Sequence, residues 1–128
     1  MLVDNLCRLL ALVLSPGQSS DHRHAPELAE QAIAYSAQTV IGDKGYDSDS
    51  LREQIEDAGL ESIIPFRKSR KARPEIDRER YKERNIVERF IGRLKENRRV
   101  ATRYDKKATH FAGFFILAAM KAWLKIIC

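Results

Sequence analysis

Four side chains that could bind a metal ion or a phosphate are spaced to share one side of a helix: Tyr81, Arg84, Glu88 and Lys95. At about 100° per residue, with Tyr81 at zero, Arg84 falls at about 300°, Glu88 at about 340° and Lys95 at about 320°. A carboxylate suits a hard cation, and Arg and Lys suit phosphate oxygens. The spacing indicates a polar stripe on the helix that could bind a metal ion or a phosphate. A plain Arg84–Glu88 ion pair worth about 0.3 kcal/mol explains the same geometry.

Two further carboxylates, those of Asp4 and Asp43, directly follow short apolar runs that are typical of β-strands. In an α/β sheet, functional residues gather beyond the carboxyl ends of the strands. We therefore expect both aspartates to occupy functional positions.

A second group with metal-binding side chain types consists of Asp21, His22 and His24. Its composition admits a metal cluster. We prefer to interpret Asp21 as a loop residue and the histidines as surface residues, because Asp4, unlike Asp21, would end a core strand.

These residues need a scaffold, and the chain is expected to supply one α/β domain. Its 128 residues, 44% hydrophobic and 32% charged, indicate a globular protein and exclude a disordered one. Strand and helix signals alternate along the amino-terminal half, which favours a mixed or parallel sheet. The expected strands are Leu9–Ser15, Thr39–Gly42 and Glu61–Phe66. The expected helices are Pro26–Ser36, Ser48 or Ser50 to Ala58, Asp77 or Arg78 to Asn97, and Thr109–Ile127.

Positive charge is concentrated in one block of the sequence. The net charge is +5, but residues 67–107 contain 17 Lys or Arg and only 7 Asp or Glu. Such a block suits a DNA backbone and gives salt-dependent affinity with little sequence information, although a basic run can also be a solvated loop. The candidate DNA-binding residues in this block are Arg67, Lys68, Arg70, Lys71, Arg98, Arg99 and Arg103.

The cysteines and the apolar segments exclude other classes of protein. Cys7 and Cys128 lie at opposite ends without the spacing of a zinc site, and a reducing cytoplasm fits them best. The uncharged run 111–120 is too short to span a bilayer, so we expect no membrane role.

Several motifs resemble one known family. Tyr81-x₂-Arg84-x₃-Glu88-x₆-Lys95 resembles the Y-(2)-R-(3)-E-(6)-K signature of DDE transposases from bacterial insertion sequences, and it is similar to the group related to insertion sequence five. The stretch IGDKGYDSD resembles the second-aspartate motif of that family, and RRVATRYDKKATHF resembles the segment after its glutamate. LVD and LALVLSPGQSSD are similar to its first-aspartate strand and the strand that follows.

The resemblance implies a ribonuclease-H-like mixed sheet with flanking helices, in which Asp4, Asp43 and Glu88 bind Mg²⁺ or Mn²⁺, as two ions. Those ions would support DNA cleavage and strand transfer in transposition. It makes double-stranded DNA the partner, at the element ends and the target, and it leaves room for a homo-oligomer on DNA. Further DNA contacts are implied for Tyr81, Arg84, Lys95 and Lys44. The protein would act in the bacterial cytoplasm, associated with the nucleoid when bound.

The chain also departs from the family at its amino end. The first strand is shortened to Leu2-Val3 before Asp4, and Asn5-Leu6-Cys7-Arg8 stands where the family usually has a glycine in the turn. We expect residues 1–128 to be the carboxy-terminal part of the catalytic domain, amino-terminally truncated and without the end-recognition domain. Little activity is then expected of this chain alone. An inactive remnant and a non-enzymatic basic DNA-binding module remain the alternatives.

Overall fold

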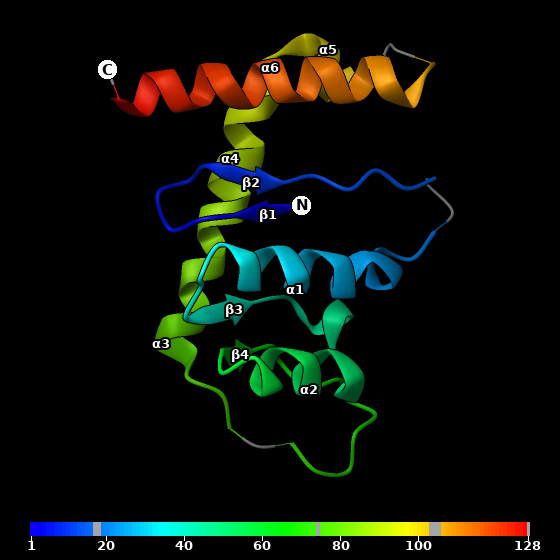
Figure 1. Cartoon of the computed structure of the whole chain (residues 1–128), viewed down its shortest axis with the longest axis vertical. Helices are drawn as coiled ribbons and strands as arrows, with labels where there is room; N and C mark the ends of the chain where they lie inside the picture. The colour runs from blue at the N-terminus through cyan, green and yellow to red at the C-terminus, as the bar shows by residue number, and fades with distance from the viewer. Residues whose placement is uncertain (17–18, 74, 103–105, 128) are drawn as a thin grey trace. The chain divides into compact units, whose positions relative to one another are not determined.

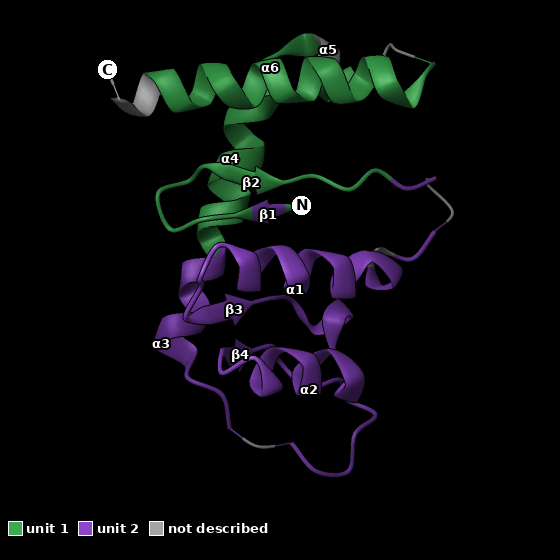
Figure 2. Cartoon of the chain, in the orientation of Figure 1, with its two compact units in different colours: residues 1, 3–14, 85–128 green, residues 2, 15–84 purple. Residues whose placement is uncertain are grey.

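The computed structural model describes residues 1–16, 19–73, 75–102 and 106–127 (Figure 1). These residues form a mixed α/β structure with short sheets and several helices. The chain divides into two compact units (Figure 2). Unit 1 contains residues 1, 3–14 and 85–128, and unit 2 contains residue 2 and residues 15–84.

Unit 2 is built around a parallel pair of short strands. In this pair β3 (Thr39–Ile41) aligns with β4 (Glu61–Ile63), so that Thr39 faces Glu61. Parallel strands need a long crossover, and here it contains α2 (Asp49–Asp57). The other elements of unit 2 are η1 (Asp21–His24), α1 (Ala25–Ala34), η2 (Lys44–Tyr46), α3 (Arg78–Tyr81) and η3 (Lys82–Arg84).

Local sequence signals fix both ends of α2. The Ser48 hydroxyl accepts a hydrogen bond from the Leu51 N–H, which caps the first turn. Gly59 follows the helix with a φ of +79°, a left-handed conformation that favours glycine. Leu51 and Ile55, one turn apart, are buried against Ala29 of α1 and Ile64. These contacts make the core of unit 2.

The described residues of unit 1 form three helices, one short strand and the Val3 end of a second strand, whose Leu2 is grouped with unit 2. β1 (Leu2–Val3) pairs with β2 (Leu9–Ala11), and the helices are α4 (Asn85–Lys95), α5 (Arg98–Thr102) and α6 (Ala108–Ile127). Phe90 and Leu94 of α4 are almost completely buried, and they pack with Phe115, Ala118 and Ala119 of α6. Small alanines allow the two helices to approach closely around the phenylalanine rings.

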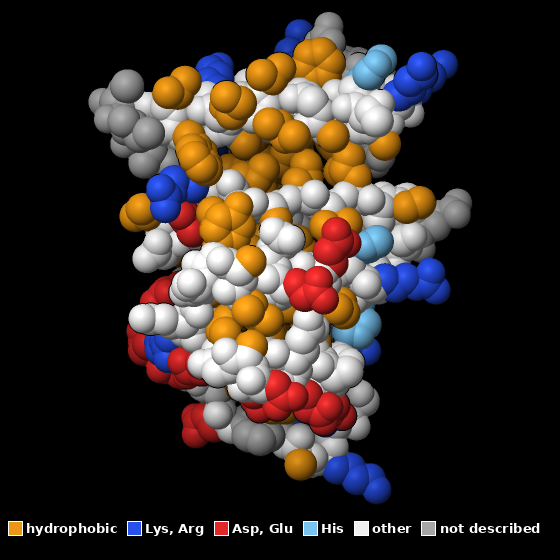
Figure 3. All heavy atoms as spheres, viewed as in Figure 1, with side chains coloured by type: hydrophobic (Ala, Val, Ile, Leu, Met, Phe, Trp, Pro, Cys, Tyr) orange, Lys and Arg blue, Asp and Glu red, His pale blue; other side chains and the backbone are white. Residues whose placement is uncertain are grey.

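The second face of α6 is also apolar but lies at the surface. Ile116, Leu117, Met120 and Leu124 are all about half exposed or more, and hydrophobic side chains are visible along α6 in Figure 3. Among the described residues, no helix is long and apolar enough to cross a membrane.

The sequence-based expectations are met in part. The parallel strand pair, the Ser48 cap and the terminal helix are confirmed. The single helix from Asp77 or Arg78 to Asn97 is wrong, because η3 separates α3 from α4. A 3₁₀ helix advances about 120° per residue and an α-helix about 100°, so three 3₁₀ residues change the expected angles by about 60°. The expected strands are too long, and α5 was not expected.

Candidate active site and DNA-binding surface

Asp43 follows β3, as the sequence predicts, with Gly42 between them. Its Oδ1 accepts a hydrogen bond of 2.6 Å from the Gly45 N–H, and its carbonyl accepts one from the Tyr46 N–H at 3.0 Å. The side chain is exposed. A Cβ atom on residue 45 would lie 2.7 Å from Oδ1, so only glycine fits this turn without displacing the carboxylate. The turn therefore presents Asp43 at the carboxyl end of a strand, with an oxygen open to solvent.

A buried aspartate, Asp47, binds the basic loop that begins at Arg67 to the residues that follow the Asp43 turn. Its side chain is inaccessible to solvent, and its two oxygens accept hydrogen bonds from Arg52 at 3.0 Å, Arg70 at 2.8 Å and the Arg67 N–H at 2.7 Å. Burial by itself raises the pKa of Asp47, but these hydrogen bonds outweigh it, and the pKa lies below its ordinary value. The guanidinium of Arg52 also stacks on Phe66, 4.0 Å from the ring centre.

Arg67 ties the basic loop back to the Asp43 turn. Its guanidinium donates to the Gly45 carbonyl at 2.9 Å and to the Lys44 carbonyl at 3.4 Å. Together with Asp47, this contact joins residues 44–47 to the start of the basic loop. The backbone around Asp43 is therefore held by side chains that lie more than twenty positions along the chain.

Asp4 lies in the turn between β1 and β2, and its carboxylate is fully engaged. Oδ1 accepts from the backbone N–H groups of Leu6 at 3.0 Å and Arg8 at 2.9 Å. Oδ2 accepts from Arg8 Nε at 2.7 Å and Nη2 at 2.6 Å. The two oxygens of a carboxylate offer about four acceptor positions, so in this conformation Asp4 has none left for a cation.

The four signature residues are divided between the units. Tyr81 ends α3 and Arg84 ends η3, both in unit 2, with the Arg84 guanidinium 5.9 Å from the centre of the Tyr81 ring. Glu88 and Lys95 lie on α4 in unit 1, and both are exposed. The four residues expected on one helix therefore lie on three elements that belong to two units.

The chemistry of three carboxylates suits Mg²⁺ or Mn²⁺, which prefer oxygen ligands. In the described part of the chain, however, no three His, Cys, Asp or Glu side chains lie close enough together to hold a metal ion. Asp43 fits the role of a ligand because its carboxylate is exposed. Asp4 does not fit in this conformation, because Arg8 occupies its oxygens.

The group of Asp21, His22 and His24 falls on η1. His24 Nδ1 lies 3.9 Å from a carboxylate oxygen of Glu27, and the buried Nδ1 of His22 has no hydrogen-bond partner among the described residues. The Asp21 side chain lies outside the described part of the structure.

The candidate DNA-binding cations differ in how their charges are balanced. Arg70 binds the carboxylates of Asp47 and Asp49, which partly neutralises its charge. Among these candidates, the exposed cations that form no ion pair with another described residue are Lys44, Arg67, Lys68, Lys71, Lys95 and Arg98. Arg103 and the Arg99 side chain lie outside the described residues.

Sequence reasoning missed three residues that shape the site: Arg8, Asp47 and Arg52. The spacing of Asp4 and Arg8 was a usable signal, since opposite charges four residues apart can pair locally. Asp47 and Arg52 are five residues apart and meet only because the turn before α2 brings them together. Neither helical nor strand spacing predicts a contact between residues five positions apart.

Comparison with known proteins identifies the family. Residues 1–122 match the model of the transposase DDE domain. The chain is also 40% identical, over 87 residues, to a putative transposase for insertion sequence element IS6501 from Brucella ovis, an alignment covering 67% of each protein. No solved structure matches. The chain therefore belongs to the transposase DDE domain family.

Proposed function

We propose that residues 1–128 act as the catalytic domain of an insertion-sequence transposase, cleaving and joining double-stranded DNA by metal-dependent phosphoryl transfer. The observation that carries the proposal is the Asp43 turn, whose exposed carboxylate follows β3 and is oriented by Gly45. Membership of the family supports the same role. A ribonuclease-H-like arrangement and membership of the group related to insertion sequence five belong to this proposal.

The proposed ligands are Asp43, Glu88 and Asp4. When bound, two Mg²⁺ or Mn²⁺ ions would activate an attacking hydroxyl and stabilise the leaving oxygen of a phosphodiester. Asp43 and Glu88 present exposed carboxylates. Because all four acceptor positions of Asp4 are occupied, its role as a ligand includes release of the Arg8 guanidinium.

The proposed DNA contacts divide into two kinds. Lys44, Lys68, Lys71 and Lys95 are exposed point charges suited to backbone phosphates, which gives affinity that falls with salt. Tyr81 and Arg84 lie next to each other at the end of α3 and η3, where an aromatic ring and a guanidinium can meet a base or a phosphate. We propose that the protein acts on nucleoid DNA in the cytoplasm, and a homo-oligomer on DNA is part of the same proposal.

Metal titration tests the catalytic proposal directly. We expect Mn²⁺ binding, followed by electron paramagnetic resonance, to weaken at least tenfold in Asp43→Asn and in Glu88→Gln, since each removes a charged ligand. Glu53→Gln, which removes an exposed carboxylate from α2, is the matched control and should bind as the unmodified protein does. Equal binding by all four proteins would refute the metal site.

A second function is favoured by the state of Asp4. If its four hydrogen bonds persist in solution, Asp4 cannot bind a metal ion, and the chain is a DNA-binding relative without catalysis. That alternative predicts salt-dependent DNA binding together with unchanged Mn²⁺ binding in the Asp4→Asn variant.

A further inference from the structure

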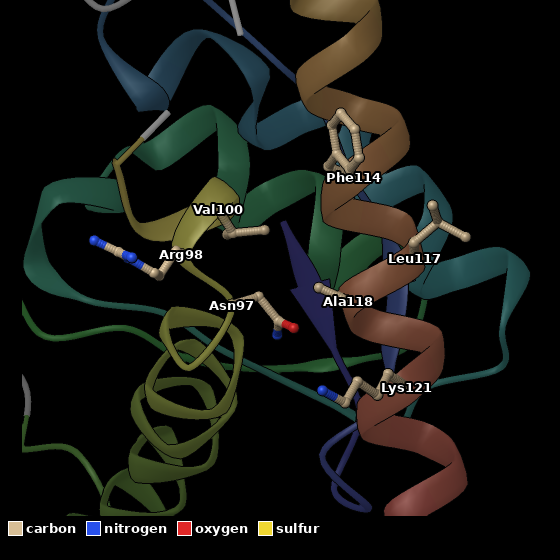
Figure 4. Close-up of a pocket in the computed structure, with 7 residues that line it drawn as sticks. All are labelled: Asn97, Arg98, Val100, Phe114, Leu117, Ala118 and Lys121. Atoms are coloured by element: carbon tan, nitrogen blue, oxygen red, sulfur yellow. The ribbon is translucent and has the colours of Figure 1, made fainter. Parts of the chain in front are cut away.

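A cavity of about 340 Å³ lies within unit 1, between α5 and α6 (Figure 4). Its volume falls at the lower end of the range for small-ligand sites, about 300–1,000 Å³. One wall is apolar, formed by Val100 of α5 with Phe114 and Ala118 of α6. The cavity lies wholly inside one unit, so its lining depends on local packing alone.

The polar side of the cavity carries positive charge and an amide. Lys121 extends from α6 toward the side of Asn97, while Arg98 contributes its stem and directs its guanidinium away from α6 (Figure 4). Neither cation forms an ion pair with another described residue, and no acidic side chain of the described chain lines the cavity. A ligand with an apolar face and an anionic group complements this lining.

Asn97 is held in place by the two helices that it joins. Its Nδ2 donates to the Leu94 carbonyl at the end of α4, at 3.3 Å. Its own carbonyl accepts hydrogen bonds from the N–H groups of Val100 at 3.0 Å and Ala101 at 3.1 Å, in the first turn of α5. The amide therefore has a fixed position from which its oxygen can accept a hydrogen bond.

We propose that this cavity binds one nucleotide of single-stranded DNA, with the base against Phe114 and an adjoining phosphate near Lys121. A base has a flat apolar face and hydrogen-bonding edges, and its phosphates are anionic, which matches the three kinds of lining. A base within a duplex is stacked between its neighbours and cannot enter such a cavity. The inference rests on the proposed function, since DNA is the partner that brings the nucleotide to the protein.

Binding of short oligonucleotides in EDTA tests this site without cleavage. The probes are a fluorescent single-stranded hexathymidylate and the same strand with all six positions abasic, measured by anisotropy at fixed salt. We expect the complete strand to bind about tenfold more tightly, because stacking of one base on an aromatic ring is worth about that factor. Phe114→Leu keeps an apolar side chain but removes the ring, and it should abolish the difference between the two strands.

A second pair of variants tests the positive charge of the cavity by removing one lysine inside it and one outside it. Lys121→Gln should weaken binding of both strands and reduce the contribution of the base, whereas Lys106→Gln removes an exposed charge outside the cavity and should leave that contribution unchanged. The same preference for the complete strand in Phe114→Leu and in the unmodified protein would overturn the proposal, as would no preference in the unmodified protein. Thermal unfolding by circular dichroism verifies that each variant folds.

This experiment is independent of the metal site. Glu88→Gln should retain the preference for the complete strand, because it changes a carboxylate outside the cavity. Failure of the nucleotide site with intact Mn²⁺ binding would leave the catalytic proposal standing. Loss of Mn²⁺ binding with an intact base preference would identify a DNA-binding protein without catalysis.

Discussion

The turns after β1 and β3 place two aspartates in similar backbone settings with different surroundings. Asp4 and Asp43 each follow a short strand, and each accepts a hydrogen bond from the N–H two residues later. Asp4 accepts three more from Arg8, whereas the Asp43 side chain has only the bond from Gly45 within the described part of the chain. A strand-end position therefore predicts where a carboxylate lies, but the side chains around it decide whether it can bind anything else.

The largest expected effect comes from the buried support of the Asp43 turn. Asp47→Asn should lower the free energy of unfolding by about 3 kcal/mol, because Arg52 and Arg70 lose the charge that pairs with them. Urea denaturation measures this, with Asp57→Asn, an exposed position at the end of α2, as the control. A change below about 1 kcal/mol would mean that the network does not hold the loop.

Asp47 should also make the stability of the folded chain depend on pH. Because the pKa of Asp47 is lower in the folded chain than its ordinary value of 3.8, its contribution is complete above that value and disappears as the pH falls through the folded pKa. The difference in stability between the unmodified protein and Asp47→Asn should be constant from neutral pH to about 5 and should shrink below 3.8.

An intermediate effect is expected at the Asp43 turn itself. Gly45→Ala places a methyl carbon 2.7 Å from Asp43 Oδ1, so the carboxylate must move and its hydrogen bond must lengthen. We expect a loss of about 1 kcal/mol in stability and weaker Mn²⁺ binding. Gly92→Ala on α4 is the matched control, because its methyl group meets no atom within 4 Å and should stabilise the helix by up to about 1 kcal/mol.

The smallest effect on stability is expected at the Asp4 turn. The Arg8 side chain is 40% exposed, so Arg8→Ala should cost about 1 kcal/mol or less. If Asp4 is a metal ligand, the same change should strengthen Mn²⁺ binding by releasing Oδ2, and it would make the two turns more alike. Arg8→Lys keeps the charge without the bidentate fork and should give an intermediate result. Unchanged Mn²⁺ binding in Arg8→Ala would count against Asp4 as a ligand.

The sequence predicts the elements well where the signals are local. The Ser48 cap, the stop at Gly59 and the position of Asp43 after its strand all depend on residues within a few positions, and all are present. The break at η3 was not predicted because residues 82–84 carry no proline or glycine and fit an α-helix equally well. The Asp47 network was missed for the opposite reason, since it joins residues far apart in the sequence.

The candidate site follows the same division. Residue types and spacing indicate which carboxylates and cations are candidates for the site. Which charges are already balanced could not be predicted, because it depends on tertiary contacts such as those between Arg70, Asp47 and Asp49. Exposure divides the basic residues into structural and available ones in a way that composition cannot.

The backbone at Cys7 has a consequence for how this sequence can change. Cys7 closes the Asp4 turn with a φ of +63°, a conformation that is unfavourable for a residue with a side chain, and its thiol donates to the Ile86 carbonyl at 3.7 Å. A single nucleotide substitution converts a cysteine codon into a glycine codon. Relief of this torsional strain is therefore one mutational step away, but the same step removes the sulfur atom and its bond to α4, so natural selection would act on the balance of the two.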